Sequence, residues 1–306
     1  MHSISLQASV FGFGSHTARI YTTSFFQTIK VIWPSFWYYG VMSKRLWLLV
    51  GIVIVVVGIV KIVNQPTGSS STANSQASSA SESGAILASS SIVSDISSVP
   101  ETTLQTIGKG SVTTEPQAIS APALTNGQKP EVFFEGAEYC PYCATERWPM
   151  AVALSKFGTF TNLKLSHSSL TDVYPDTHTL SFYGSTYSSQ YINFSSVELY
   201  SNVPDDGFYT TLQTPTAAEQ KLASTYDTSQ AIPFIDFGGK YIVSGATYNP
   251  ALLQGKSWNQ IASSLSDSNS TIAKGVDGAA NGLIAAICSM TNGQPSNVCS
   301  ADTTTL

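Results

Sequence analysis

The chain has 306 residues, including 14 lysine or arginine and 19 aspartate or glutamate residues, so its formal net charge at pH 7 is -5. Residues 1–63 contain five basic side chains and no acidic one, whereas residues 126–306 contain eight basic and 15 acidic side chains. An acidic surface repels phosphate backbones, and no basic cluster interleaved with aromatic residues occurs, so the sequence argues against nucleic-acid binding. The uneven composition also predicts one large folded unit.

The run of residues 46–63 has the length and composition of a transmembrane helix. Its only charged residue is Lys61, whose long side chain can reach the membrane interface. Lys44 and Arg45 precede the run, which favours a cytoplasmic N-terminus and an exported C-terminal portion. A cleaved signal peptide is the alternative, but residues 64–67 form a poor cleavage site. We therefore expect an uncleaved, single-pass anchor in the cell membrane.

Residues 1–45 precede the expected anchor and have two interpretations. Either the natural start is near Met42, where the sequence has the form of a signal anchor, or the aromatic stretch 31–39 lies at the membrane interface. After the anchor, residues 64–90 are dominated by Ser, Ala and Thr and cannot bury enough apolar surface to offset chain entropy. They predict a flexible tether, and residues 91–306 are expected to form the folded domain with an N-terminal extension.

The first half of the expected domain combines helix and strand patterns. A short helix is expected to begin near Ser98 and Pro100, which occupy capping positions. The apolar run 130–135 predicts the first core strand, and a helix that Pro149 should kink is expected at 143–157. Aromatic and β-branched residues then predict three further strands: 163–168, 179–183 and 191–200.

The second half predicts a helix at 216–226 and then a β-hairpin at 232–243, turning at Gly238-Gly239. Helices at 250–265 and 271–290 should close the domain, and apolar residues repeat along one face of the second. The resulting order is β-α-β, additional strands, α, then β-β-α. This order predicts an α/β, thioredoxin-like fold with a central β insertion and an extra C-terminal helix, preceded by one transmembrane helix.

Four cysteines occur, all after the predicted anchor, as the pairs Cys140/Cys143 and Cys288/Cys299. A C-x-x-C motif between a strand and a helix places its first sulfur at the helix N-terminus, where unpaired amides and the helix dipole stabilise a thiolate. We therefore expect Cys140 to be an exposed nucleophile with a lowered pKa. Cys143, one turn inside the helix, would resolve the mixed disulfide formed at Cys140.

Zinc binding is the main alternative for this motif, because C-P-x-C also occurs in zinc knuckles. Ala144 stands where a knuckle usually has Gly, and ten residues rather than two separate the second cysteine pair. His167 and His178 complete no familiar ligand pattern. We expect redox chemistry that uses no metal or other cofactor, and a purely structural bridge in the motif is the remaining alternative.

Cys288 and Cys299 flank the turn-rich loop 291–295. An even number of cysteines in an exported domain favours disulfides. We expect a structural disulfide between these two residues that clamps the C-terminal end and stabilises the fold by roughly 2 to 4 kcal/mol. A second redox relay is the alternative.

The strings GAEYCPYC and AIPFIDFGGKYIVSG resemble the thioredoxin superfamily, including the disulfide-bond oxidoreductases of bacterial envelopes. The resemblance implies a cis peptide between Ile232 and Pro233, with Ile232 offering its backbone to an extended substrate peptide. We count Tyr142 with these two residues as a candidate for substrate binding. Glutaredoxins share the string YCPYC, but the long insertion after Cys143 and the lack of a basic cluster argue against glutathione chemistry.

Three longer stretches resemble more specifically a membrane-anchored prokaryotic family catalogued as domain of unknown function 929: GAEYCPYCATERWPMAVALSKFGTF, TLSFYGSTYSSQYINFSSVELYSN and ICSMTNGQPSNVC. This resemblance covers roughly residues 92–299. The family name records no activity, so the functional interpretation depends on the cysteines. We expect an extracytoplasmic thiol-disulfide oxidoreductase that acts on exported proteins together with an unidentified redox partner. The alternative is a surface-tethered binding or scaffold domain, and solvent access to Cys140 separates the two.

Other polar and aromatic residues have weaker functional interpretations. Glu138 and Glu146 could raise a thiol pKa or shuttle a proton, but solvated loop and helix positions are the preferred interpretation. Loop solvation is likewise preferred to a metal or hydrolytic site for four residues: His167, Asp172, Asp176 and His178. Core packing with partial exposure is preferred to a peptide-binding surface for five aromatic residues: Phe182, Tyr183, Tyr187, Tyr191 and Phe194.

Overall fold

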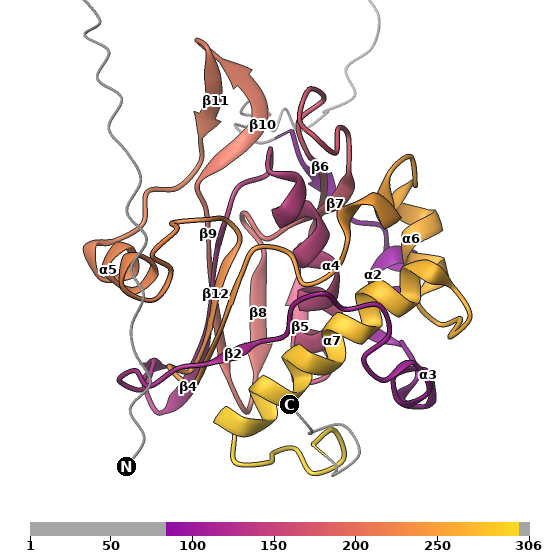
Figure 1. The fold of residues 1–306 in the computed structure, drawn as a ribbon, viewed down its shortest axis with the longest axis vertical. Helices are drawn as coiled ribbons and strands as arrows, with labels where there is room; N and C mark the ends of the chain where they lie inside the picture. Colours follow the sequence, from indigo (N-terminus) through magenta and orange to yellow (C-terminus); the bar gives the residue numbers. More distant parts are fainter. Residues whose placement is uncertain (1–83, 300–306) are drawn as a thin grey trace, which may run out of the picture. The chain divides into compact units, whose positions relative to one another are not determined.

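The computed structural model describes residues 84–299, which form a mixed α/β structure (Figure 1). This confirms the predicted α/β class. The expected N-terminal segment, the membrane anchor at 46–63 and most of the expected tether lie outside the described residues. Within the described range, no helix is both long enough and apolar enough to cross a bilayer.

Six α-helices and one 3-10 helix occur among the described residues. Their bounds are α2 (Ser90–Ser97), α3 (Glu101–Ile107), α4 (Pro141–Ser155), α5 (Ala217–Tyr226), η1 (Pro250–Leu253), α6 (Trp258–Ser264) and α7 (Thr271–Met290). The predicted helices at 216–226 and 271–290 are confirmed as α5 and α7. Helix α4 continues through Pro149 as one element.

The single helix predicted at 250–265 is wrong, because η1 and α6 are separate elements. Gly255, between them, has a positive φ of 66°, which an α-helix does not accommodate. Ser257 then begins α6 with a capping box, in which its hydroxyl accepts from the backbone of Gln260 and the Gln260 side chain accepts from the backbone of Ser257. The chain therefore ends one short helix and starts another.

The central sheet has β9 and β4 side by side in parallel, followed by β12, β13 and β2 in antiparallel order. A short strand, β3, pairs with the start of β4. The bounds are β2 (Gln117–Ala118), β3 (Thr125–Asn126), β4 (Lys129–Gly136), β9 (Asn193–Glu198), β12 (Phe234–Phe237) and β13 (Tyr241–Ser244). The predicted hairpin at 232–243 is confirmed as β12 and β13, which pair from Phe234 opposite Ser244 to Phe237 opposite Tyr241.

Three smaller sheets surround the central one. Their strands are β1 (Ile86–Leu87), β5 (Gly158–Thr161), β6 (Lys164–His167), β7 (His178–Ser181), β8 (Thr186–Ser189), β10 (Tyr200–Asp205) and β11 (Phe208–Thr211). They pair as β1-β6-β7, β5-β8 and β10-β11. The β10-β11 hairpin projects from the end of the molecule near the start of α4 (Figure 1). Because Ile86 and Leu87 pair with β6, regular structure begins before residue 91.

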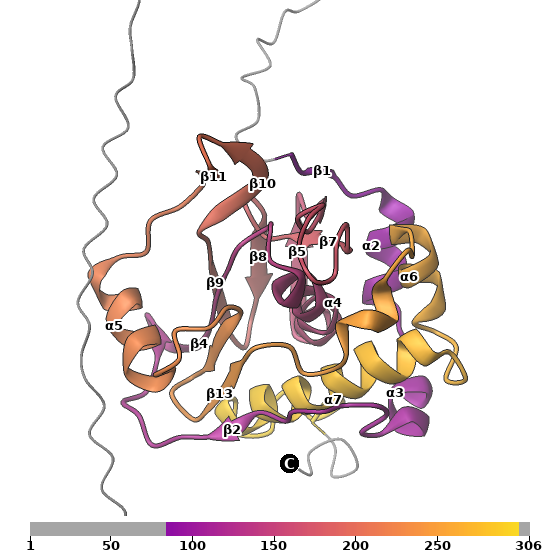
Figure 2. The same ribbon diagram turned by 45° about the horizontal axis from the view of Figure 1, so that its top comes forward.

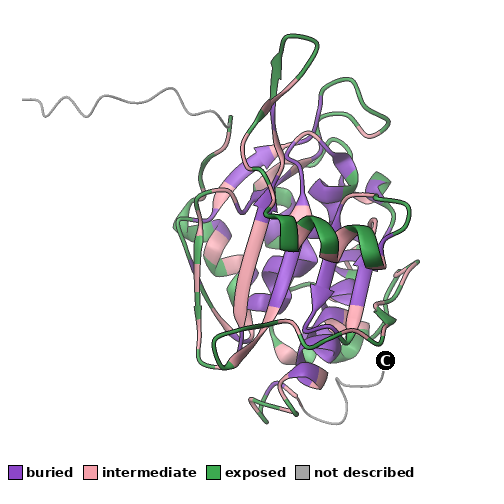
Figure 3. Ribbon diagram, turned by 90° about the vertical axis from the view of Figure 1, so that its left-hand side faces the viewer, coloured by how far each residue is buried: buried purple, intermediate pink, exposed green. Residues whose placement is uncertain are grey.

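Helices cover both faces of the central sheet. Alternate residues of β4 point to opposite sides: Val132 and Phe134 join the main core, whereas Phe133 joins a smaller cluster that includes residues of α5. Helix α7 packs along α4, and α2, α3 and α6 pack around these two helices (Figure 2). On the opposite face, α5 lies across the strands with most of its residues exposed (Figure 3).

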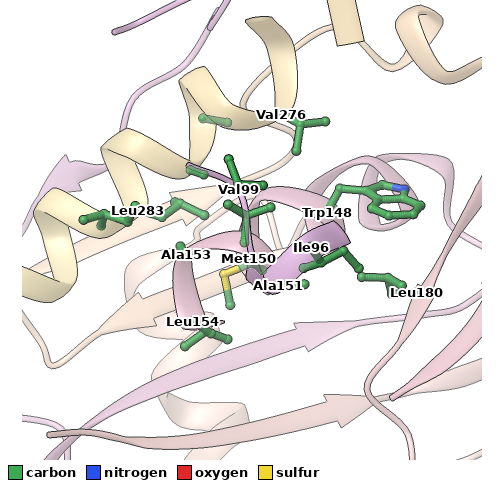
Figure 4. Close-up of a cluster of buried hydrophobic side chains, with 14 of the residues drawn as sticks. Ile96, Val99, Trp148, Met150, Ala151, Ala153, Leu154, Leu180, Val276 and Leu283 are labelled. Atoms are coloured by element: carbon green, nitrogen blue, oxygen red, sulfur yellow. The ribbon is translucent and has the colours of Figure 1, made fainter. Parts of the chain in front are cut away.

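Helix α4 runs through the interior of the domain. Every residue from Cys143 to Leu154 is buried, and this segment contributes Trp148, Met150 and Leu154 to the core between α2 and α7 (Figure 4). A helix buried on all sides has no solvated face. The polar side chains of α4 must therefore find partners inside the protein, and several of them lie next to the cysteine motif.

Candidate functional site

The C-x-x-C motif lies where β4 gives way to α4. Cys140 is the N-cap residue of α4, with extended backbone angles, and Pro141 occupies the first helical position. The backbone N–H of Cys143 donates to Sγ of Cys140 at 3.3 Å. Both thiols are free. The sulfur of Cys140 therefore takes the place of an N-cap oxygen and lies at the positive end of the helix dipole.

The environment shifts the pKa of the two thiols in opposite directions. A hydrogen bond from the Cys143 side chain lowers the pKa of Cys140, helped by the Cys143 backbone N–H and the charge of Arg147, although burial opposes the shift. Burial raises the pKa of Cys143 well above its ordinary value, and the neighbouring Cys140 adds to the rise. Cys140 is thus the thiol that ionises first, as a nucleophile must.

The expectation that Cys140 has an exposed sulfur is wrong. The residue is only 5% exposed, and Cys143 is fully buried. Five residues enclose the two cysteines: Ala137, Tyr139, Leu199, Tyr200 and Ile232. The sequence predicted an exposed sulfur because Cys140 stands at the start of a helix. Residues distant in sequence, Leu199, Tyr200 and Ile232, cover that helix start. A substrate reaches the sulfur only when part of this cover moves.

The three residues expected to bind substrate differ in their relation to Cys140. The peptide bond between Ile232 and Pro233 is cis, and the carbonyl oxygen of Ile232 lies 3.7 Å from Sγ of Cys140. The structure therefore brings Ile232 to Cys140 across 92 residues of sequence. Tyr142 is 41% exposed, and its ring meets that of Tyr174 edge to face at 5.9 Å.

A buried ion pair lies next to the motif. Arg147 donates from Nε to Oε1 of Glu198 at 2.8 Å and from Nη2 to Oε2 at 2.6 Å, and neither side chain is exposed. Oε1 of Glu198 also accepts from the backbone N–H of Phe182 at 3.2 Å. The third guanidinium nitrogen, Nη1, has no hydrogen-bond partner among the described residues. Sequence reasoning missed this pair, because 51 residues separate its members.

Gly136 lies between the ion pair and the Cys143 thiol. It lies opposite Glu198 in the parallel pairing of β4 with β9. A Cβ atom at Gly136 would lie 2.6 Å from the ring of Phe134 and 3.2 Å from Sγ of Cys143, so only glycine leaves room for both neighbours. The guanidinium carbon of Arg147 lies 5.6 Å from the centre of the same Phe134 ring. The positive charge and the Cys143 thiol therefore share one buried cluster.

The preferred interpretation of Glu138 and Glu146 as solvated residues is wrong, since both are fully buried. Oε1 of Glu138 accepts from Oγ of Ser181 at 2.5 Å. Oε2 of Glu146 accepts from the backbone N–H and the hydroxyl of Thr247 at 2.9 and 2.7 Å. Burial nevertheless raises the pKa of Glu146 to about 8, against the effect of these hydrogen bonds. Glu146 is buried because α4 is enclosed on all sides, and Glu138 is buried in the short connection between β4 and α4.

The histidines and aspartates singled out in the sequence do not converge. Nδ1 of His167 lies 3.3 Å from Oδ1 of Asp176, which is on the surface, as is Asp172. The ring of His178 instead lies against Trp258, at 3.8 Å between centroids. Across residues 84–299, no three His, Cys, Asp or Glu side chains are grouped so that they could hold a metal ion.

Cys288 and Cys299 form a disulfide, with 5.5 Å between their Cα atoms. Cys288 lies in the last turn of α7, so the bond ties the following loop back to that helix. The Thr291 hydroxyl donates to the Gln294 carbonyl at 2.6 Å within the same loop. This pair is therefore bonded, whereas Cys140 and Cys143 are not.

A family profile described as Domain of unknown function (DUF929) matches residues 115–205 and 207–289. The match takes in both cysteines of the motif, the Ile232-Pro233 peptide and the ion pair of Arg147 with Glu198. Comparisons with curated proteins and with solved structures found no match. Since the matched residues make up more than half of the chain, the protein belongs to the DUF929 family.

Proposed function

We propose that this protein is a membrane-anchored thiol-disulfide oxidoreductase whose extracytoplasmic, thioredoxin-like domain acts on the disulfides of exported proteins. The observation that carries the proposal is the position of Cys140 at the N-cap of α4, where its free thiol accepts the backbone N–H of the free Cys143 at 3.3 Å. The pKa of Cys140 is lowered by its hydrogen bond from Cys143, and the pKa of Cys143 is raised by burial. This asymmetry is what a nucleophile and its resolving partner require.

The strand order supports the thioredoxin-like part of the proposal. Strands β9, β4, β12 and β13 lie in that order, with β9 parallel to β4 and the other two pairings antiparallel. Along the chain, α4 lies between the parallel strands β4 and β9. Helix α5 comes before β12, and α7 comes after β13. A β-α-β unit followed by a helix and a β-β-α unit is the arrangement expected from the sequence. The proposed insertion then consists of β5 to β8, between α4 and β9, and of β10 and β11, between β9 and α5.

The reaction proceeds by two thiol-disulfide exchanges. The Cys140 thiolate attacks one sulfur of a substrate disulfide, which forms a mixed disulfide and releases the other substrate sulfur as a thiolate. Cys143 loses its proton and attacks Sγ of Cys140, which forms the Cys140-Cys143 disulfide and releases the second substrate thiol. The substrate gains the two electrons that the cysteines lose. The reverse sequence oxidises a substrate dithiol, and a dithiol or disulfide partner resets the enzyme.

Arg147 supports this chemistry by its charge. It lowers the pKa of both cysteines, as a secondary effect in each case. Cys143 and Arg147 are four residues apart on α4, so they lie on the same face of the helix. Each exchange passes through a buried thiolate, and a fixed positive charge in a medium of low dielectric constant stabilises it.

The membrane location belongs to the same proposal. The apolar run 46–63 would anchor the chain, and residues 64–83 would leave the domain free to meet exported proteins. Both segments lie outside the described residues. An extracytoplasmic location also provides the oxidising surroundings in which the Cys288-Cys299 disulfide persists.

A redox titration of the full-length protein tests the activity. The protein is equilibrated with glutathione buffers of increasing oxidising power, and free thiols are then alkylated and counted by mass. We expect Cys140 and Cys143 to lose their labels together in one two-electron transition. The Cys140→Ser variant is the control, because it retains Cys143 and cannot form the bond. Independent labelling of the two thiols at every potential would exclude a redox pair.

One observation favours a second candidate function. Since Cys140 is only 5% exposed, the domain could serve as a surface-tethered binding or scaffold module with structural disulfides only. A small disulfide reagent separates the two candidates. Rapid reaction at Cys140 in the folded, reduced protein supports the oxidoreductase, whereas reaction only after denaturation supports the binding module.

A further inference from the structure

Exposed apolar side chains gather around the start of α4. Two segments of the insertion carry four of them: the loop 168–177, between β6 and β7, and the β10-β11 hairpin. Leu170 and Val173 in the loop are each 66% exposed, and Phe208 and Val203 in the hairpin are 50% and 39% exposed. With Tyr142 of the motif, we call these residues the apolar rim. Side chains this large usually face the interior, so a group of them beside one site indicates a binding surface.

Contacts join the apolar rim to the nucleophile. Tyr139, the residue before Cys140, stacks on Tyr209 of the hairpin, with 4.5 Å between ring centroids and an angle of 6°. The ring of Phe208 meets Tyr139 edge to face at 5.4 Å. From the loop side, the backbone N–H of Ser169 donates to the carbonyl oxygen of Tyr139 at 2.8 Å. Tyr139 is therefore held between the loop and the hairpin.

The two segments are also joined to each other. The hydroxyl of Tyr209 donates to Oγ of Ser169 at 2.7 Å. At the base of the hairpin, Nδ2 of Asn202 donates to the carbonyl oxygen of His167 at 2.9 Å. The loop and the hairpin are thus joined by hydrogen bonds and form one continuous surface.

The charge of this surface indicates the chemistry of its partner. The segments 168–177 and 200–211 contain four aspartates and no lysine, arginine or histidine. All four are exposed: Asp172, Asp176, Asp205 and Asp206. Apolar side chains bordered by carboxylates complement a segment that combines apolar and basic residues. An anionic lipid surface would instead be repelled by these carboxylates.

We propose that the loop 168–177 and the β10-β11 hairpin form the docking surface for the polypeptide substrate, an extended segment with apolar and basic side chains near its cysteine. This inference rests on the proposed function and names its substrate class. The hairpin is a separate sheet of two strands, to which an extended segment can add a third, and the apolar rim offers side-chain contacts. Tyr200 of the hairpin packs against the buried cluster that contains the two cysteines, and its ring meets that of Phe208 at 5.0 Å, so a docked segment contacts residues that cover the site.

The test measures binding without thiol chemistry, which separates its outcome from that of the proposed function. The full-length Cys140→Ser/Cys143→Ser protein is titrated with a fluorescent, cysteine-free peptide rich in Leu, Phe and Lys. Two matched peptides carry Glu in place of Lys, or Ser in place of Leu and Phe. We expect the first peptide to bind at least about tenfold more tightly than either of the others.

Variants locate the binding surface. Leu170→Ser/Val173→Ser should weaken binding by roughly tenfold while leaving the thermal unfolding midpoint close to that of the parent, because these two side chains are largely exposed. Phe208→Ser should weaken binding by a similar factor but also lower the midpoint, because it removes ring contacts with Tyr139 and Tyr200. Asp172→Asn/Asp205→Asn should weaken binding of the basic peptide but not of the acidic one. Asp267→Asn, on the exposed turn before α7, is the charge control.

Two outcomes would overturn the proposal. The first is equal affinity of the parent and the apolar-rim variants for the basic, apolar peptide. The second is binding of the parent, but not of the Leu170→Ser/Val173→Ser variant, to vesicles that contain an anionic lipid, with no binding of any peptide. In that case the apolar rim contacts a membrane.

Discussion

The guanidinium of Arg147 makes two hydrogen bonds to the carboxylate of Glu198, at 2.8 and 2.6 Å, within a part of the protein that no solvent reaches. Placing two charges in such surroundings is expensive, and a well-packed apolar pair often serves stability equally well. The pair lies beside Gly136 and the Cys143 thiol, and the charge of Arg147 acts to lower the pKa of both cysteines, which an apolar pair cannot do.

Replacing Arg147 by Met should destabilise the protein by roughly 3 to 5 kcal/mol, because Glu198 is left as an uncompensated buried charge. The double variant Arg147→Met/Glu198→Met removes both charges and should recover most of that loss. Urea unfolding of the full-length protein in detergent, followed by tryptophan fluorescence, measures both. Equal destabilisation by the single and double variants would mean that packing, and not charge, explains the effect.

The same double variant tests the electrostatic role of Arg147. The guanidinium helps to lower the pKa of Cys140, so its loss should move the midpoint of Cys140 alkylation to higher pH. A purely structural role predicts no such shift in a variant that folds. The Arg147→Lys variant keeps the positive charge but cannot form the bidentate pair with Glu198. Its midpoint of Cys140 alkylation should lie between those of the parent and the double variant.

Asp277 should make the protein less stable as pH rises. Burial raises the pKa of this α7 carboxyl from 3.8 to about 8, although the charge of Lys156 opposes the shift, and neither carboxyl oxygen has a hydrogen-bond partner among the described residues. The native state therefore binds a proton that the unfolded state has lost between these pH values. In that window the free energy of unfolding should fall by up to about 1.4 kcal/mol per pH unit from this group.

The Asp277→Asn variant has no titrating group at this position. Its free energy of unfolding should therefore fall less steeply with pH than that of the parent. The difference in free energy of unfolding between the variant and the parent should shift in favour of the variant from about pH 5 to pH 8 and then level off. Glu146, with a pKa raised by burial to about 8, contributes a slope of the same sign in both proteins. Parallel stability curves for the parent and Asp277→Asn would show that the carboxyl of Asp277 is already ionised in the folded protein.

If the Cys288-Cys299 disulfide is structural, as we propose, it should remain oxidised when Cys140 and Cys143 are reduced mildly. Mass mapping after gentle reduction and alkylation measures this directly. Replacing both residues by Ser should lower stability by about 2 to 4 kcal/mol without changing the reactivity of Cys140. Preferential labelling of Cys288 would instead identify the second pair as a participant in electron transfer.

The sequence predicted elements whose signals lie within their own segment. Helix α7 runs from Thr271 to Met290 as expected, because its apolar residues repeat on one face and Ser270 caps its start. Strands β12 and β13 follow from two apolar runs around a pair of glycines. In contrast, the two-residue strand β1 depends on its partner β6, and nothing in Ile86-Leu87 alone indicates it.

The sequence predicted less of the site than of the fold, because the residues that surround the two cysteines belong to segments distant in sequence. The cysteine motif and Ile232-Pro233 were recognisable as strings of residues. The burial of Cys140 was not, since Leu199, Tyr200 and Ile232 cover it. The charged residues of α4 resemble those of a solvated helix, and only the packing around α4 shows that they are internal.

The proposed topology can be tested on intact cells. Residues 46–63 should hold the protein in the membrane and leave the domain outside the cytoplasm. Protease added to cells should therefore remove the C-terminal domain, with wall permeability controlled by a known exported protein. Protection of the domain until the cells are lysed would contradict this orientation.

The most direct test of the redox assignment is the pH dependence of Cys140 alkylation, combined with trapping in the Cys143→Ser variant. The reduced full-length protein is treated with iodoacetamide across a pH series, and the label on each cysteine is quantified by mass. The account predicts that Cys140 reacts with a midpoint below that of an ordinary thiol, and that Cys143→Ser accumulates mixed disulfides through Cys140 while Cys140→Ser accumulates none. An ordinary thiol profile at Cys140, together with no trapped partner or model substrate, would contradict catalysis and leave the tethered binding module as the function of the domain.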